Sequence, residues 1–172
     1  MPRFVAADAS PLIGLATAGE FAVLHELFGT VTITRIIKDE VTARSALPGA
    51  QELDAAMREG WIRVAPASLE TWRFAGIDAG EASTIALAEQ HAGALVLMDD
   101  ALGRAQAGAL GLEVLDTAGV LLAAKRARLV NAVRPLVVRL ARRGFTLPED
   151  ARLALLEAAG EATRSATSER DP

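Results

Sequence analysis

Acidic residues stand directly after short apolar runs, or early in expected helices, at several points of this chain. They are Asp8, Glu40, Glu81 and the adjacent pair Asp99 and Asp100. The carboxyl ends of parallel strands form one crevice, so acids there can converge although about ninety residues separate the first from the last. Carboxylates gathered in this way repel one another unless a cation lies between them. The pattern therefore indicates a metal site with oxygen ligands.

The composition fits one folded domain with a hard metal ion. The chain has 172 residues, of which 51% are hydrophobic, and it contains no cysteine. The hydrophobic residues are enough for a substantial core. Because cysteine is absent, oxygen atoms are the natural metal ligands, and Mg²⁺ or Mn²⁺ fits best. No apolar run approaches the length of a membrane span, and the first residues lack a long apolar segment. We therefore expect a soluble, cytoplasmic protein.

Short β-branched or apolar runs alternate with segments of helical pattern. We expect strands at residues 4–7, 30–34, 61–64, 94–98 and 113–115. We expect a helix opening at residues 10–11 and further helices at about 20–28, 35–44, 49–60, 78–93, 101–110, 117–128, 131–143 and 149–161. This alternation is typical of an α/β fold with a central, mostly parallel sheet.

Several of the acids also have plain structural interpretations. Asp8 stands where a helix N-cap is expected. The spacing of Asp78 and Glu81 matches a capping box, which explains Asp78 better than Glu81. One of Asp99 and Asp100 could cap the following helix, but two adjacent anions favour a nearby cation or basic group.

Other polar residues carry weaker signals. Glu40 lies in the charged segment 38–40, which on a helix is most often solvated surface, so its role depends on the other acids. His25 and His91 have no second histidine at ligand spacing, and we interpret both as structural.

The charge distribution changes after residue 116. Residues 1–116 carry 8 basic and 16 acidic side chains, whereas residues 117–148 carry 7 basic side chains and no acidic one. Lys125 with Arg128 and Arg139 with Arg142 are spaced to share a helix face. Phosphate contact and an acidic protein partner explain this basic stretch equally well.

Five segments together resemble the PIN domain, in particular the toxin-type ribonucleases of bacterial and archaeal toxin–antitoxin pairs. They are Asp8–Ile13, Ile37–Val41, Asp78–Ala82, Leu97–Arg104 and Gly111–Leu122. Their order and spacing agree over roughly residues 3–130. The common toxin pattern has an aspartate where this chain has Glu81, so either Asp78 or Glu81 could face the metal, and we favour Glu81.

The resemblance implies an architecture. It predicts an α/β/α sandwich with a nuclease domain at residues 1–130. Residues 131–161 are then a helical extension of the same domain, and residues 162–172 a disordered tail.

The resemblance also implies an activity, which is Mg²⁺- or Mn²⁺-dependent hydrolysis of phosphodiester bonds in RNA. The acidic pocket would consist of Asp8, Glu40, Glu81, Asp99 and Asp100, with Glu40 holding a water or a second ion and the other four holding the metal. Substrate contacts are assigned to Ser10, Arg104 and Lys125, although Arg104 could equally form a surface salt bridge. The expected partners are RNA, a small antitoxin protein and a second copy of the chain.

Two alternatives come from other functional classes. The first is a metal-binding domain without useful nuclease activity that acts as an interaction module. The second is a receiver-like α/β domain in which Asp8 or Asp99 accepts a phosphoryl group. Acids from four separate segments are more than the second alternative needs.

Overall fold

The computed structural model describes residues 3–43, 46, 48–66 and 71–162. Its strands are β1 (Val5–Ala7), β2 (Val31–Ile33), β3 (Ile62–Val64), β4 (Leu95–Leu97) and β5 (Glu113–Leu115). Its helices are α1 (Ala9–Ala18), α2 (Val23–Phe28), α3 (Arg35–Ala43), α4 (Ala50–Glu59), the 3₁₀ turn η1 (Thr71–Arg73), α5 (Ala79–Glu89), α6 (Ala101–Ala109), α7 (Thr117–Arg126), α8 (Arg134–Arg142) and α9 (Glu149–Ala158).

The five strands form one parallel sheet in the order β3-β2-β1-β4-β5. The predicted α/β class is therefore confirmed. β1 lies in the middle, with Ala7 opposite Leu97 of β4, and the N–H of Asp8 extends the pairing by donating to the Leu97 carbonyl at 2.9 Å. Because the strands run the same way, the residues after β1, β2 and β4 reach the same edge of the sheet.

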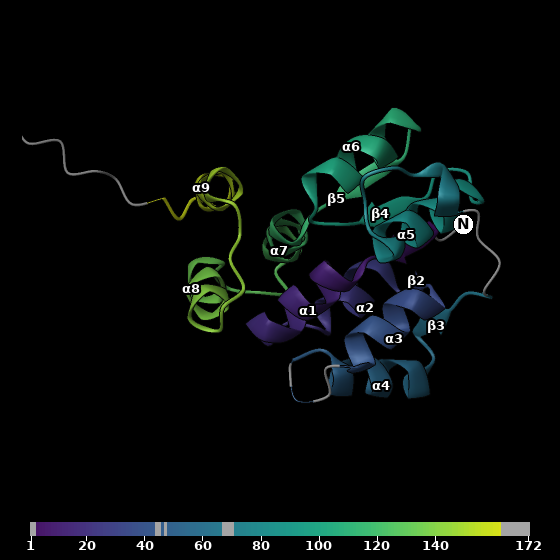
Figure 1. Ribbon diagram of the computed structural model, residues 1–172. Helices are drawn as coiled ribbons and strands as arrows, with labels where there is room; N and C mark the ends of the chain where they lie inside the picture. Colours follow the sequence, from purple (N-terminus) through teal and green to yellow (C-terminus); the bar gives the residue numbers. More distant parts are fainter. Residues whose placement is uncertain (1–2, 44–45, 47, 67–70, 163–172) are drawn as a thin grey trace, which may run out of the picture.

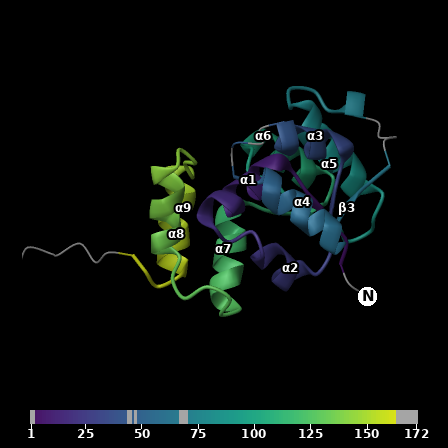
Figure 2. The same cartoon turned by 90° about the horizontal axis from the view of Figure 1, so that it is seen from below.

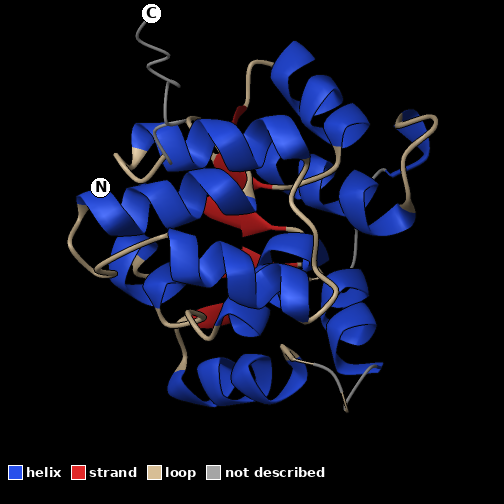
Figure 3. Cartoon of the chain, turned by 90° about the vertical axis from the view of Figure 1, so that its left-hand side faces the viewer, coloured by secondary structure: helices blue, strands red, loops and turns tan. Residues whose placement is uncertain are grey.

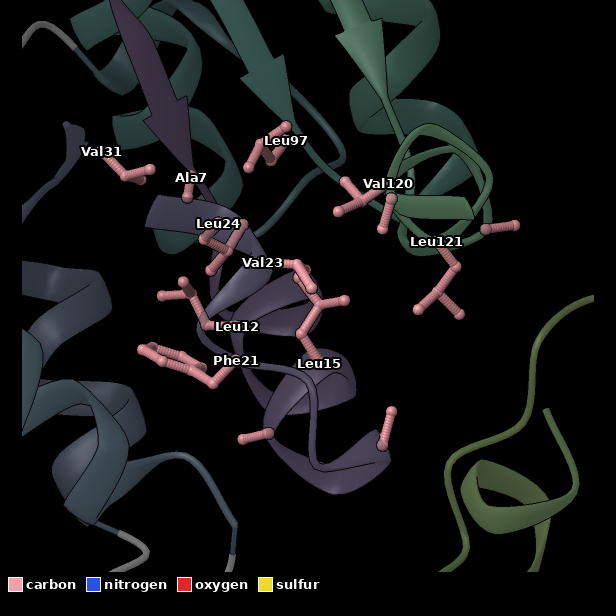
Figure 4. Packing of buried hydrophobic residues seen from close by; sticks show 14 of the residues in the cluster. Ala7, Leu12, Leu15, Phe21, Val23, Leu24, Val31, Leu97, Val120 and Leu121 are labelled. Carbon is pink, nitrogen blue, oxygen red and sulfur yellow. The ribbon is translucent and has the colours of Figure 1, made fainter. Parts of the chain in front are cut away.

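Helices cover both faces of the sheet, as Figures 1 and 3 show. Successive residues of a strand point to opposite faces. Ala6 of β1 accordingly joins the cluster formed with α5 and α6, whereas Val5 and Ala7 join the larger cluster on the other face. Figure 4 shows this larger cluster, in which side chains of α1, α2 and α7 meet. The result is the α/β/α sandwich that the resemblance implies.

The helices α8 and α9 stand side by side at one end of the molecule, beyond α7 (Figures 1 and 2). α8 packs on α1, and α9 packs on α7. Gly14 of α1 permits this approach, because a Cβ atom there would lie 2.7 Å from the ring of Phe145 in the α8–α9 connection. Leu140, Leu155 and Leu156 are buried in the same large cluster as the sheet.

Several element ends differ from the predicted ones by a few residues. One difference changes an interpretation. α7 ends at Arg126, and Arg128 adopts a left-handed conformation with φ of 61° in the following turn. The expectation that Lys125 and Arg128 share a helix face is therefore wrong, whereas Arg139 and Arg142 do lie together on α8.

None of the helices formed by the described residues is long and apolar enough to cross a membrane. The predicted division of the chain into residues 1–130, 131–161 and 162–172 stays a prediction, and residues 163–172 lie outside the described part of the chain.

Candidate active site

Asp8 is the most deeply buried acid at the carboxyl edge of the sheet. It follows β1 and occupies the N-cap position of α1, with its side chain only 6% exposed. Its side chain makes no helix-cap hydrogen bond within the described part of the chain, whereas Asp78, Asp100 and Asp116 each cap a helix. Capping, its plain structural interpretation, therefore does not explain why an acid is buried here.

Burial raises the pKa of Asp8 from 3.8 to about 7. The N–H of Ala9 opposes this shift, and the negative charges of Asp78, Glu81 and Glu40 add to it. Acids from the end of β1, from α3 and from the start of α5 thus share one electrostatic environment. We call Asp8, Glu40, Asp78, Glu81 and Asp100 the acidic site.

Gly80 allows the acids of α3 and α5 to approach one another. A Cβ atom at this position would lie 3.2 Å from Oε2 of Glu40, 3.2 Å from Oδ1 of Asp78 and 2.9 Å from the Ile37 side chain. A larger residue would push these groups apart. Glu40, whose position in a charged segment suggested plain surface, is therefore directed at the start of α5.

Asp78 and Glu81 form the reciprocal capping box that their spacing suggests. The N–H of Glu81 donates to Oδ1 of Asp78 at 2.8 Å, and the N–H of Asp78 donates to Oε2 of Glu81 at 3.1 Å. Burial raises the pKa of Glu81, the hydrogen bond from Asp78 lowers it, and the charges of Asp78, Asp100 and Glu40 raise it further. Glu81 is thus both part of a cap and part of the acidic site.

Asp99 and Asp100 have different surroundings although they are adjacent. Asp100 is exposed, and its Oδ1 accepts from the N–H of Gly103 at 2.8 Å at the start of α6. The half-buried Asp99 accepts from the N–H of Thr117 at 2.7 Å and from its hydroxyl at 2.8 Å. Burial raises the pKa of Asp99, and these two hydrogen bonds oppose that shift. The charges that act on Asp99 belong to Asp116 and Arg104.

A family model described as a PIN domain (DUF3368) matches residues 4–161 of the chain. The chain belongs to the PIN-domain family. No curated protein and no solved structure matched it. PIN domains are generally nucleases that use divalent metal ions.

The donor set of this PIN domain suits a hard cation, since the acidic site offers carboxylate oxygens. Within the described residues, however, no group of three or more acidic or histidine side chains is close enough to hold a metal as it stands. The charges of Glu40, Asp78 and Glu81 act on Asp8, but these side chains would have to move closer together to form a coordination sphere. A divalent cation would offset both the burial of the Asp8 charge, which is the main cause of its raised pKa, and the repulsion from the neighbouring acids.

The residues predicted to contact substrate lie in varied surroundings. Arg104 forms an ion pair with Asp116 at 2.9 Å, and its Nε is buried without a hydrogen-bond partner among the described residues. Lys125 pairs with Glu161 at 3.2 Å, at the far end of α7 from the residues that follow β5. Ser10 lies in the first turn of α1, two residues after Asp8.

Sequence analysis missed several polar residues near this edge of the sheet. Thr34 and Ser83 are both buried and hydrogen-bonded to each other at 2.8 Å, which links the end of β2 to α5. Asp116 caps α7 by accepting from the N–H of Gly119 at 2.7 Å. The position of Asp116, directly after a strand, was a usable signal. No feature of the sequence indicated the pairing of Thr117 with Asp99.

Proposed function

We propose that this PIN domain is a metal-dependent ribonuclease that hydrolyses phosphodiester bonds in RNA. The proposal rests on the surroundings of Asp8. It is a buried acid without a helix-capping role in the described structure, and the carboxylates of Glu40, Asp78 and Glu81 raise its pKa further. Perturbed carboxyl groups gathered at the carboxyl edge of a parallel sheet are typical of a functional site.

Asp8, Glu81 and Asp100 would hold one or two Mg²⁺ or Mn²⁺ ions. When bound, such an ion polarises the phosphate and lowers the pKa of a water molecule. Glu40 would accept a hydrogen bond from that water, since its carboxylate is directed toward the start of α5. Arg104 would have to leave its ion pair with Asp116 to contact a phosphate.

The proposal extends to the partners. Four arginines on or just after α7 and α8 are exposed, and they offer positive charge to an RNA backbone: Arg126, Arg128, Arg142 and Arg143. The resemblance to toxin-type ribonucleases supports a toxin role, a small antitoxin that blocks the acidic site, and a homodimer.

A second candidate function is a catalytically weak interaction module. The absence of a ready coordination sphere among the described residues favours it. If this candidate is correct, changes at the acidic site alter stability or partner binding but no cleavage rate.

The test is cleavage of an end-labelled RNA of mixed sequence by the purified chain, with Mn²⁺ or with EDTA. We expect cleavage with Mn²⁺ that EDTA and Asp8→Ala both abolish. Asp54→Ala, which removes an exposed acid on α4, is the matched control and should cleave like wild type. Circular dichroism checks that each variant is folded. Equal cleavage by Asp8→Ala, or none by wild type freed of any antitoxin, would favour the interaction module.

A further inference from the structure

The two acids after β4 are directed to different helices. Both oxygens of Asp99 accept hydrogen bonds from a single residue, Thr117, the first residue of α7. Thr117 is fully buried, so water does not compete for these bonds. Asp100 instead faces solvent, caps α6 and contributes to the charge around Glu81.

A second link joins the start of α7 to α6. Asp116, the N-cap of α7, accepts from the guanidinium of Arg104 on α6 at 2.9 Å. In Figure 1, α6 and α7 lie on either side of β5. The start of α7 is therefore tied twice at the carboxyl edge of the sheet, to the end of β4 through Asp99 and Thr117 and to the first turn of α6 through Asp116 and Arg104.

We infer that Asp99 is a positioning residue that fixes the start of α7 to the end of β4, and that Asp100 is the acid of the pair that serves the acidic site. The role given to Asp100 rests on the proposed function, whereas the Asp99–Thr117 clamp does not. The clamp holds the 99–100 backbone in the orientation that presents Asp100 beside Glu81. The two bonds from Thr117 occupy one lone-pair site on each Asp99 oxygen, so they fix the direction in which Asp99 could offer its remaining sites.

The first test compares Mn²⁺ binding by three variants without RNA, followed by electron paramagnetic resonance. We expect Asp100→Asn to raise the Mn²⁺ dissociation constant more than about a hundredfold. We expect Asp99→Asn and Thr117→Val to raise it by similar, smaller factors, about ten- to a hundredfold, as changes to residues around the ligand set do. Asp54→Asn, with the same loss of charge on an exposed surface, should bind like wild type. Loss of Mn²⁺ binding by Asp99→Asn to the extent seen for Asp100→Asn would overturn the inference.

The second test is thermal unfolding in EDTA, which needs neither metal nor RNA. Thr117→Val should lower the melting temperature of wild type but leave that of Asp99→Ala unchanged, because the bond it removes is already absent there. An equal effect of Thr117→Val in both backgrounds would refute the clamp. A wild type that binds no Mn²⁺ but shows this coupling would refute the proposed function alone.

Discussion

Asp8 should make the metal-free protein less stable as the pH rises. Its pKa is 3.8 in its ordinary state and about 7 in the folded chain, so between these values the folded state binds a proton that the unfolded state does not. Stability then falls from about pH 4 to about pH 7, by roughly 3 to 4 kcal/mol in total at most. The raised pKa values of Glu81 and Asp99 act in the same direction.

Asp8→Asn should therefore be stabilising in EDTA at pH 8, because a neutral side chain of the same shape avoids the buried charge. The measurement is thermal unfolding from pH 4 to pH 8, in which the variant should show a flatter profile than wild type. Mn²⁺ should raise the melting temperature of wild type and not that of Asp8→Asn. A variant less stable than wild type at pH 8 would contradict the burial of a charged Asp8 near other acids.

Glu81 has two roles that one substitution can separate. Glu81→Gln keeps an oxygen that can accept from the N–H of Asp78, so the capping box survives while the charge is lost. We expect the melting temperature in EDTA to stay the same or rise, and Mn²⁺-dependent cleavage to fall by more than about tenfold. Asp78→Ala breaks the cap and should lower stability by about 1 kcal/mol. If Glu81→Gln cleaved like wild type, Glu81 would be a capping residue only.

Glu40 lies within α3 and gave only a weak signal. The sequence indicated the other members of the acidic site, because each follows a strand or opens a helix, and such positions can be recognised without coordinates. It could not distinguish Asp99 from Asp100. Asp99 and Asp100 are adjacent in the chain, but their side chains point in different directions. The partner of Asp99, Thr117, lies 18 residues further along the chain. The role of Gly80 was also invisible, since a missing Cβ matters only once α3 lies against α5.

At the scale of elements, α6 contains two glycines whose surroundings predict opposite effects of alanine. A Cβ atom at Gly103 would lie 2.5 Å from Sδ of the fully buried Met98, so Gly103→Ala should destabilise the protein by about 1–3 kcal/mol. A Cβ atom at Gly108 would meet nothing within 4 Å, so Gly108→Ala should stabilise it by about 0.5 kcal/mol. Denaturant unfolding of the two variants measures both effects, and a loss of stability in Gly108→Ala would contradict this packing of α6.

The strands were predictable to within one residue at each end because their apolar runs are short and bounded. The ends of the helices were less predictable than those of the strands. The segment 20–22 extends the helical pattern but forms a turn before α2, and α7 stops at Arg126 although the pattern continues. Arg128 takes the left-handed conformation that glycine usually adopts after a helix, and the N–H of Leu129 then donates back to the carbonyl of Ala124 at 2.9 Å.

At the scale of the whole molecule, much of the basic stretch holds the C-terminal helices in place. Lys125 pairs with Glu161, and Arg134 and Arg139 donate to the backbone carbonyls of Glu161 and Ala18. Charge counting predicted a surface for a polyanion, but it could not tell which cations are used internally. Arg142 and Arg143 are exposed and take part in none of these contacts, so they are available for the proposed RNA binding.

Glu161 links the C-terminal helices α8 and α9 to each other and to α7. Its carboxylate accepts from the N–H groups of Val133 at 2.9 Å and Arg134 at 2.8 Å, and it therefore satisfies free donors at the start of α8 from the end of α9. Burial alone would raise the pKa of Glu161, but these bonds and Lys125 lower it overall. The stabilisation is present above the ordinary value of 4.5 and is lost as the pH falls below it.

Glu161→Ala should therefore loosen α8 and α9 before the sheet. We expect a loss of about 1–3 kcal/mol, because two backbone donors and the ammonium of Lys125 lose their partner. Hydrogen exchange should accelerate in residues 131–142 and stay unchanged in β1 and β4. Glu157→Ala, which removes an exposed acid from α9, is the matched control and should leave exchange as in wild type. Because α8 packs on α1, which begins directly after Asp8, uniform acceleration through β1 would mean that the C-terminal helices and the acidic site unfold as one unit.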